Sequence, residues 1–369
     1  MTELDDLLPE GLADALPAEA AAVTRAMRAA LDTMDAHGYD RVRPPLIEFE
    51  RSFSQRMEGV STRRMVRFTD PVSLRTLAVR SDMTPQVGRI AATALAHATR
   101  PLRLCYAGEV ATIRADQLDP ARQRLQLGAE IIGSDTVAAA REAVELAVDA
   151  VIAAGAKKIS VDFTLPDLVD TLASGMLPLP SGAVDAVRRE LDMKDAGGLV
   201  EAGGEDYLPL LYAAGPLEEA LGRLAEMDDG GALASRLGAL REIASGLGEG
   251  VRVTLDPTER HGFEYQSWFG FALYAYGARH AIGRGGTYVI HGSDEPAVGF
   301  SLYLEPLLEA IGLEGEARDV LFLPAEHDLE AARRLRAIGW RTVAALSDDD
   351  DAAALGCTHV LQDQEPRVL

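Results

Sequence analysis

The sequence predicts an α+β fold with a helical insertion and a small C-terminal α/β unit. Strand-forming runs at 65–68 and 74–80 are joined by Thr-Asp-Pro-Val-Ser, which is typical of a β-hairpin. Residues 165–250 have the pattern of several helices joined by glycine pairs. After Gly315 the pattern becomes strand, helix, strand. These observations separate a main body, an insertion and an appendage.

The length of the chain indicates two domains. At 369 residues it exceeds one comfortable hydrophobic core, and we place the domains at 1–317 and 318–369. The second piece, of about fifty residues, is short for an independent domain. Apolar residues at 47% and charged residues at 25% are ordinary for a soluble globular protein.

The net charge and the cysteines indicate which partners the protein can bind and in which cellular compartment it works. The chain has 36 basic and 58 acidic residues, a formal charge of −22, and a surface this acidic disfavours nucleic acid as the main partner. Cys105 and Cys357 have neither disulfide nor metal-site spacing and fit small buried hydrophobes. No run approaches roughly 18 apolar residues, and the acidic start is unlike a signal peptide. We therefore expect a cytoplasmic protein without membrane contact.

The first elements are a helix and an interrupted strand. Apolar spacing predicts a helix over 17–36, with proline in its first turn and glycine just past its end. Residues 38–50 look extended, but Pro44 and Pro45 exclude a central position in a sheet. Such a segment belongs either at an ordinary sheet edge or at a subunit interface.

Polar residues crowd between the hairpin and the next helix, which is predicted over 87–99. In one interpretation Thr84 is the N-cap of that helix, with Pro85 at its first position. In the other, Asp82 offers a carboxylate to an ammonium group in a pocket at the end of the strand. The residues alone leave both open.

Two strands follow, at 102–110 and 125–133, with a polar loop between them. In the second strand Gln126, Gly128 and Glu130 fall on one face, because side chains alternate with a period of two. A face that carries Gln and Glu is either solvated or lines a polar pocket.

The middle of the chain combines helices and strands. A helix over 136–154 and a strand over 158–163 lead into the insertion, whose acidic residues we interpret as a solvated face. The strand pattern returns at 251–256, and residues 260–268 and 269–276 look like paired antiparallel strands.

A glycine-rich stretch follows. The glycines around Arg284 predict a turn at 283–286, where the backbone comes close to a ligand or a neighbouring strand. Residues 297–302 are small and apolar, which predicts a buried strand end, and a leucine-rich helix comes next. The glycines are structural in one interpretation and part of a site in the other.

These segments together resemble a known family. The set resembles the catalytic core of histidyl-tRNA synthetases, a class II synthetase fold, over roughly residues 5–315. Within that group it is most similar to the synthetase-derived regulatory subunits of ATP phosphoribosyltransferase, the first enzyme of histidine biosynthesis. The resemblance is carried, after the first helix and the proline-broken strand, by Arg-Ser-Asp-Met-Thr-Pro, Cys-Tyr-Ala-Gly-Glu-Val, Gln-Leu-Gly-Ala-Glu, His-Gly-Phe-Glu-Tyr-Gln, Arg-Gly-Gly-Thr-Tyr and Pro-Ala-Val-Gly-Phe-Ser-Leu.

The resemblance implies an antiparallel sheet flanked by helices, a homodimer formed through 38–50, and L-histidine bound on the sheet. A buried ammonium needs carboxylate partners, and an imidazole needs directed hydrogen bonds. The ammonium would face Asp82 and Thr84, with Gln126 and Glu130 nearby. The implied histidine-binding residues are Asp82, Thr84, Arg114, Gln126, Glu130, His261, Glu264, Tyr265, Gln266 and Tyr288, of which Glu264, Tyr265, Gln266 and Tyr288 would frame the imidazole.

Departures from the synthetase pattern argue against catalysis. Synthetases need arginines to hold the phosphates of ATP. One of these arginines falls at Thr112, with Arg114 displaced by two residues, and the other falls at Pro306. Tyr303 replaces a glycine and would fill the place of adenine.

The histidine-specific motifs also depart from the pattern. An expected arginine falls at His261, with Arg260 one residue out of register. Thr287 and Val289 replace two residues of the Arg-Gly-Gly motif.

Three functions follow as hypotheses. The first is a non-catalytic regulatory subunit without cofactor or metal, which assembles with a short catalytic ATP phosphoribosyltransferase subunit, activates it and carries histidine feedback. The second is a divergent synthetase-like enzyme that activates an amino acid with ATP. The third is a scaffold whose pocket is vestigial. The C-terminal unit resembles a truncated anticodon domain, so we expect no tRNA partner.

Overall fold

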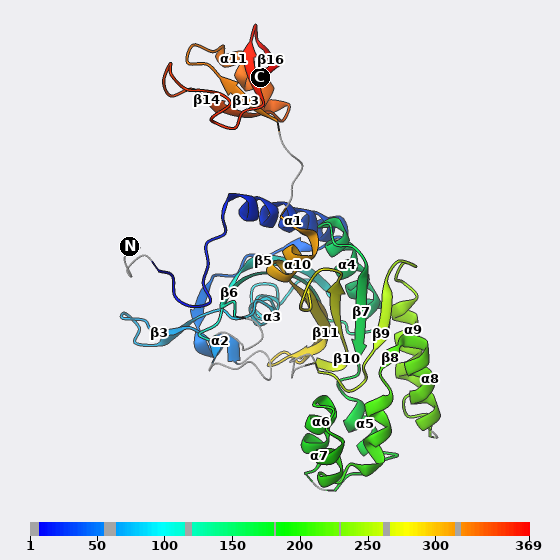
Figure 1. The fold of residues 1–369 in the computed structure, drawn as a ribbon. Coiled ribbons are helices and arrows are strands. Elements are labelled where there is room, and N and C mark those ends of the chain that lie inside the picture. The colour runs from blue at the N-terminus through cyan, green and yellow to red at the C-terminus, as the bar shows by residue number, and fades with distance from the viewer. Residues whose placement is uncertain are drawn as a thin grey trace. The chain divides into compact units, whose positions relative to one another are not determined.

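The computed structural model describes most of the chain in two units. By contacts the chain divides into Met1–Leu313 and Glu314–Leu369 (Figure 1). The described residues are 7–54, 64–114, 120–180, 182–228, 230–260, 266–313 and 319–369.

The first unit is built on a nine-stranded mixed sheet. Its central strands, from β5 to β7, pair antiparallel, whereas β1 joins β5 and β9 joins β7 in parallel. In spatial order the strands are β1 (Asp40–Arg41), β5 (Leu102–Ala111), β6 (Gln123–Ile132), β12 (Glu295–Tyr303), β11 (Gly283–Ile290), β10 (Gln266–Ala275), β7 (Ile159–Thr164), β9 (Arg252–Leu255) and β8 (Gly215–Pro216).

The two faces of this sheet differ in polarity. Alternate residues of the central strands, such as Leu127, Phe300 and Phe271, belong to the main hydrophobic core. Helices on this side cover the sheet (Figure 1). They are α1 (Pro17–Ala36), α4 (Val137–Ala153) and α10 (Leu304–Ile311). The intervening residues form the opposite face, which carries most of the polar candidate residues.

A small sheet and two helices lie beside the polar face. The sheet has the order β2 (Ile47–Phe49), β4 (Thr76–Val79), β3 (Arg67–Thr69), and the pairing of β3 with β4 confirms the predicted hairpin. Helix α2 (Glu50–Ser54) follows β2. Helix α3 (Thr84–Ala92) contributes Val87 and Ala91 to an apolar cluster with strands of the large sheet.

Two predictions for α3 are wrong. The N-cap is Met83 and not Thr84, which is the first helical residue and makes no capping bond. Its hydroxyl bonds instead to Tyr106 and Glu130 of the sheet. The helix ends at Ala92, short of the predicted residue 99, and turns continue from there.

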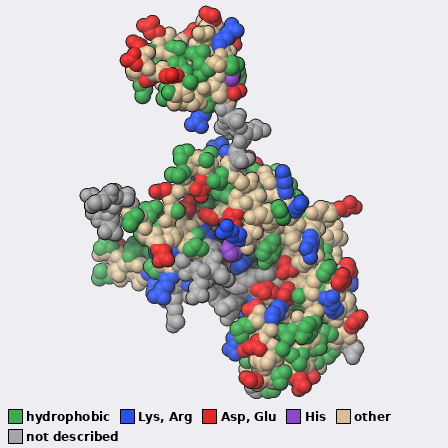
Figure 2. All heavy atoms as spheres, viewed as in Figure 1, with side chains coloured by type: hydrophobic (Ala, Val, Ile, Leu, Met, Phe, Trp, Pro, Cys, Tyr) green, Lys and Arg blue, Asp and Glu red, His purple; other side chains and the backbone are tan. Residues whose placement is uncertain are grey.

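The predicted insertion is helical apart from the short strand β8. Its elements are α5 (Leu168–Ala173), α6 (Val184–Asp192), α7 (Ala196–Glu201), η3 (Glu205–Tyr212), α8 (Leu217–Met227) and α9 (Ala234–Ala244). Figure 2 shows acidic side chains spread over this region on the viewed face. Glu190 departs from the predicted solvated face, because it is only 7% exposed and accepts hydrogen bonds from Arg189.

The glycines at 283–286 lie in β11, so the predicted turn there is wrong. Their small size has a different use. A Cβ on Gly285 would lie 2.5 Å from the carbonyl oxygen of Gly299 on the neighbouring strand and as close to the Phe271 ring. The expected close approach to a neighbouring strand is therefore confirmed, while the turn is not.

The predicted pair of strands over 260–268 and 269–276 lies partly outside the described residues, which do not include 261–265. Residues 266–275 form the single strand β10, which lies between β7 and β11. Its register with β11 shifts between Gln266 and Gly270, which marks a β-bulge. The predicted boundary between the two strands, at 268–269, therefore falls on this irregularity within β10 and not on a turn.

The second unit is a four-stranded sheet with one helix. The predicted strand–helix–strand pattern corresponds to its first three elements, and the last two strands were not predicted. In spatial order the strands are β14 (Arg341–Ala344), β13 (Val320–Leu323), β15 (His359–Gln362) and β16 (Glu365–Val368), and the helix is α11 (Leu329–Ala337). Leu321, Leu323 and Leu335 belong to its small core.

Candidate functional site

Glu130 is the centre of a buried polar network on the polar face of the sheet. Its side chain is 1% exposed and projects from β6. Oε1 accepts hydrogen bonds from the hydroxyls of Thr84 and Tyr106, each at 3.1 Å. Oε2 accepts one from the Tyr288 hydroxyl at 2.9 Å. Three elements, α3, β5 and β11, therefore converge on one carboxylate.

Gln126 connects this strand to the turn before α3. Its Nε2 donates to Asp82 Oδ1 at 2.8 Å, and its Oε1 accepts from the Met83 amide at 2.9 Å. Asp82 Oδ1 also accepts from the Thr84 amide at 3.0 Å. The turn at 82–84 is thus held against β6 at two points, and Asp82 and Glu130 lie on the same side of the sheet.

Tyr106 and Ser301 complete the network and were missed from the sequence. The hydroxyls of Tyr106 and Ser301 lie 3.2 Å apart, and Gln126 Nε2 donates to Ser301 Oγ at 2.7 Å. Both residues pair across the sheet with Gly128, so they share its face. The alternation of side chains in its strand could have placed Tyr106 on one face, but only the order of the strands in the sheet brings that face next to Ser301 and Gln126.

Glycines make room for these side chains. A Cβ on Gly128 would overlap the Tyr106 ring and its hydroxyl, and a Cβ on Gly299 would overlap Glu130 Oε2. Since both glycines lie in strands at the floor of the network, the backbone there comes close to the polar groups because no side chain intervenes.

Burial governs the protonation of the site. The pKa of Glu130 is raised to about 8, mainly by burial and in addition by the nearby Asp82 charge, while hydrogen bonds from Tyr288, Thr84 and Tyr106 oppose the rise. Burial also raises the pKa of Tyr106 well above its ordinary value. Burial thus favours the neutral carboxyl of Glu130, whereas a nearby cation such as an ammonium group would favour the carboxylate.

Comparison with known proteins identifies the family. The histidyl-tRNA synthetase family model matches residues 11–307. An ATP phosphoribosyltransferase regulatory subunit from Rhodospirillum centenum is 38% identical over 364 residues, which cover 96% of this chain and 94% of the relative. The chain belongs to the ATP phosphoribosyltransferase regulatory subunit family.

Solved structures show that the regulatory-subunit chain has a synthetase-type fold. A Bacillus halodurans C protein described as an ATP phosphoribosyltransferase regulatory subunit/histidyl-tRNA synthetase matches with a TM-score of 0.80 at 23% identity, covering 96% of this chain and 97% of that one. A histidyl-tRNA synthetase from Nostoc sp. PCC 7120 matches at 0.78 with 14% identity, covering 97% and 91%. The predicted fold class is confirmed.

Of the remaining predicted site residues of this regulatory-subunit chain, some lie in or near the network, one is exposed and others are not described. Tyr288 belongs to the network, whereas Arg114 is exposed at the end of a described stretch. The backbone of Gln266 pairs with Tyr288 at the start of β10. His261, Glu264 and Tyr265 lie outside the described residues.

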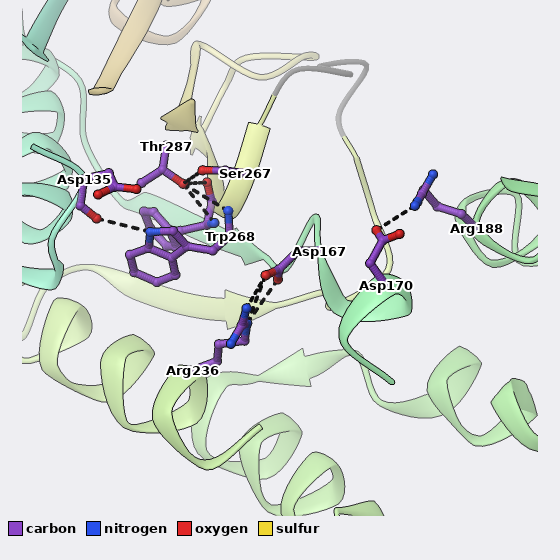
Figure 3. Close-up of polar contacts among 9 residues, drawn as sticks. Asp135, Asp167, Asp170, Arg188, Arg236, Ser267, Trp268 and Thr287 are labelled. Atoms are coloured by element: carbon purple, nitrogen blue, oxygen red, sulfur yellow. Dashed lines mark hydrogen bonds and ion pairs between the residues drawn. The ribbon is translucent and has the colours of Figure 1, made fainter. Parts of the chain in front are cut away.

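Thr287 belongs to the opposite face of the sheet. Its neighbour across β12 is Val298, a member of the main core. Its Oγ1 accepts from the amides of Trp268 and Phe269, at 3.2 and 3.1 Å, and from the Ser267 hydroxyl at 2.8 Å (Figure 3). Thr287 thus satisfies backbone donors at the bulge of β10, and its departure from the synthetase pattern does not alter the Glu130 network directly.

Tyr303 lies on the polar face, since it pairs with Gln126 across β12 and β6. The pKa of Tyr303 is raised to about 12, mainly by burial and in addition by the nearby Asp82, while Arg284, Arg124 and Arg64 oppose the rise. Pro306 is the third residue of α10 and has no cationic side chain.

Metal sites and membrane-spanning helices are both absent from the part of the chain that the structure describes. No group of three His, Cys, Asp or Glu side chains among them is arranged to hold a metal ion. None of the helices formed by these residues is long and apolar enough to cross a bilayer.

Proposed function

We propose that this chain is a non-catalytic regulatory subunit that binds L-histidine in the Glu130 network and passes its state to a catalytic ATP phosphoribosyltransferase subunit. The family membership supports the regulatory role. The observation that supports this choice of ligand is the buried Glu130 carboxyl, with Asp82 on the same face of the sheet. Two carboxyl groups in such a place are suited to a cationic ligand.

The ligand would use the two ends of the site differently. The ammonium group of L-histidine would be held by Asp82, Thr84, Gln126 and Glu130. The imidazole would be held by Tyr288 together with Glu264, Tyr265 and Gln266, and the resemblance adds Arg114 and His261. An arriving ammonium favours the ionised form of Glu130, so binding would release a proton at neutral pH.

The proposed partners follow from the same resemblance. The chain would form a homodimer through 38–50 and a hetero-oligomer with the catalytic subunit, and it would bind no tRNA. Aminoacylation is not part of the proposal, because Thr112 and Pro306 stand where synthetases have ATP-holding arginines. Histidine binding that favours one assembly state is a coupling free energy of about 1–3 kcal/mol.

Calorimetric titration of L-histidine into the wild type and into Glu130→Gln tests the ligand. We expect saturable binding by the wild type and a loss of at least about tenfold in affinity in the variant, because the amide has no charge to pair with the ammonium. In two buffers of different ionisation enthalpy, the wild type should show proton release.

Glu190→Gln is the matched control, since Glu190 is also a buried carboxylate but lies in the insertion. It should bind histidine like the wild type. Equal binding by the wild type and Glu130→Gln would refute the site. Mixing the chain with the catalytic subunit and measuring phosphoribosyl transfer, with and without histidine, tests regulation directly.

A second candidate function is amino-acid activation with ATP. The specific observation in its favour is that Arg64, Arg124 and Arg284 lie close enough to Tyr303 to lower its pKa, so cations are present on the polar face. An ATP–pyrophosphate exchange assay with L-histidine distinguishes the two functions. Exchange above that of a buffer control would support the enzyme, and its absence supports the regulatory subunit.

A further inference from the structure

Two arginines, Arg124 and Arg284, lie beside the Glu130 network on the polar face of the large sheet. Arg124 comes two residues before Gln126 in β6, so the alternation of side chains puts both on this face. Arg284 of β11 pairs with Ser301 of β12. Directly opposed residues of antiparallel strands share a face and have Cβ atoms about 4.5–5.5 Å apart. Both arginines are partly buried.

Tyr303 is close to both arginines and to the acidic part of the site. It pairs with Gln126 across β12 and β6, and the guanidinium carbon of Arg124 lies 5.8 Å from the centroid of its ring. After burial, the main cause of its raised pKa is the Asp82 charge, whereas Arg284 and Arg124 lower the pKa. Charges of both signs therefore act on the same phenol.

Hydrogen bonds connect the position opposite Arg284 to the acidic part of the site. Gln126 Nε2 donates to Ser301 Oγ at 2.7 Å and to Asp82 Oδ1 at 2.8 Å. The residue that faces Arg284 across the strands is thus one side chain away from a carboxylate that is proposed to hold the ammonium. The basic and the acidic parts of the polar face adjoin each other.

An α-amino acid requires such a neighbourhood, because its ammonium and its carboxylate are attached to the same carbon atom. A ligand whose ammonium lies at Asp82 and Glu130 must place its carboxylate close by. A carboxylate that leaves water needs hydrogen-bond donors, and a guanidinium group supplies two parallel ones in a matching plane. The proposed function gives partners to the ammonium and to the imidazole, so the carboxylate still needs its own.

We propose that Arg124 and Arg284 hold the α-carboxylate of L-histidine and make the site select an amino acid over an amine or an alcohol with the same ring. The inference rests on the proposed function and adds its specificity-determining residues. Both arginines lie on the face that carries Gln126 and Ser301, and both adjoin the acidic part of the site. The polar face would then recognise the two charged groups of the ligand with groups of opposite sign.

Calorimetric titration of the full-length chain with three ligands tests this inference. L-histidine is the reference, L-histidinol has a hydroxymethyl group in place of the carboxylate, and a ring-methylated L-histidine keeps the carboxylate but changes the ring. We expect the wild type to prefer histidine over histidinol by about a hundredfold, because two charged partners are lost. In Arg284→Met, and separately in Arg124→Met, this preference should fall by about tenfold. The preference over methylhistidine should stay unchanged.

Further variants separate ligand recognition from stability. Arg284→Lys keeps a cation without the planar fork and should lose less of the preference than Arg284→Met. Arg124→Met provides a test if Arg284→Met does not fold. Arg103→Met is the matched control, because Arg103 is a cation of the same sheet that pairs with Glu142 of α4 at 2.6 Å. It should keep the wild-type preference.

The outcomes are distinct. A lower preference over histidinol in both arginine variants, but not in Arg103→Met, supports the inference. A change in one variant alone overturns the role of the other arginine. Unchanged preferences in a chain that binds histidine overturn the inference and leave the proposed function intact, and so does an equal loss of preference over methylhistidine. A wild type that binds no histidine overturns the proposed function and this inference with it.

Discussion

The two faces of the large sheet use the same alternation of residues for opposite purposes. On one face Phe271, Phe300 and Leu302 are fully or almost fully buried beneath helices and join a single core. On the other, Glu130 and Gln126 are equally buried, but directed hydrogen bonds hold their polar groups. The comparison shows that burial alone does not identify a structural residue. We expect the first face to govern stability and the second to govern binding and its pH dependence.

The largest expected effect is on the apolar face. Phe271→Ala removes a fully buried ring that stacks on Phe269 with 5.8 Å between ring centroids. The free energy of unfolding should fall by about 3–5 kcal/mol, because a cavity is left in the core. Urea denaturation measures this loss. Histidine affinity per folded molecule should stay the same, and a parallel loss of affinity would show that the two faces are not separable.

Thr287 is a buried polar residue on the otherwise apolar face, and its substitution tests what its hydroxyl contributes to stability. Thr287→Val keeps the shape but removes the oxygen that accepts from the Trp268 and Phe269 amides. Leaving buried donors without a partner should lower the free energy of unfolding by about 1–3 kcal/mol. Thermal and urea unfolding measure it, with Thr287→Ser, which keeps the oxygen, as the control. A loss in Thr287→Ser as large as in Thr287→Val would assign the effect to packing.

The smallest of the three effects, when counted per pH unit, is expected on the polar face, where the free energy of unfolding depends on pH. The pKa of Glu130 is about 8 in the folded chain and 4.5 in the ordinary reference, so the folded state binds the extra proton between these values. Its contribution to stability is complete below pH 4.5 and is lost as the pH rises toward 8. Relative to Glu130→Gln, the wild type should lose roughly 1 kcal/mol per pH unit between about pH 6 and 8.

Unfolding curves of both proteins across this pH window provide the measurement. The difference between them isolates Glu130 from other buried carboxyl groups, such as Asp162 and Glu305, whose pKa values burial also raises. Parallel pH profiles would mean that Glu130 is ionised in the folded chain.

The sequence predicted which face of a strand a side chain occupies better than it predicted which side chains from different strands meet. The period of two placed Gln126 and Glu130 on one side of their strand, because alternation is a local property of the backbone. Tyr106 and Ser301 lie 195 residues apart and meet only through the strand order, which no local pattern contains. The family resemblance was confirmed, but the network was completed by residues it had not singled out.

Some predictions were wrong because the same residue types fit two different local structures. Glycines at 283–286 fit a turn and also fit a strand that packs closely on Gly299 and Phe271, and the choice depends on contacts distant in sequence. Thr84 fits an N-cap, yet a buried carboxylate competes for its hydroxyl. The bulge in β10 similarly looked like the boundary between two strands.

The overlap between a Cβ at Gly299 and Glu130 Oε2 has a consequence for sequence drift. A Cβ there would also lie 2.5 Å from the carbonyl oxygen of Ala129, which belongs to the backbone and stays in place whatever residue occupies position 130. Glycine at position 299 should therefore persist among relatives even where Glu130 has been replaced. A larger residue at position 299 would instead mark a lineage in which the backbones of β6 and β12 had moved apart.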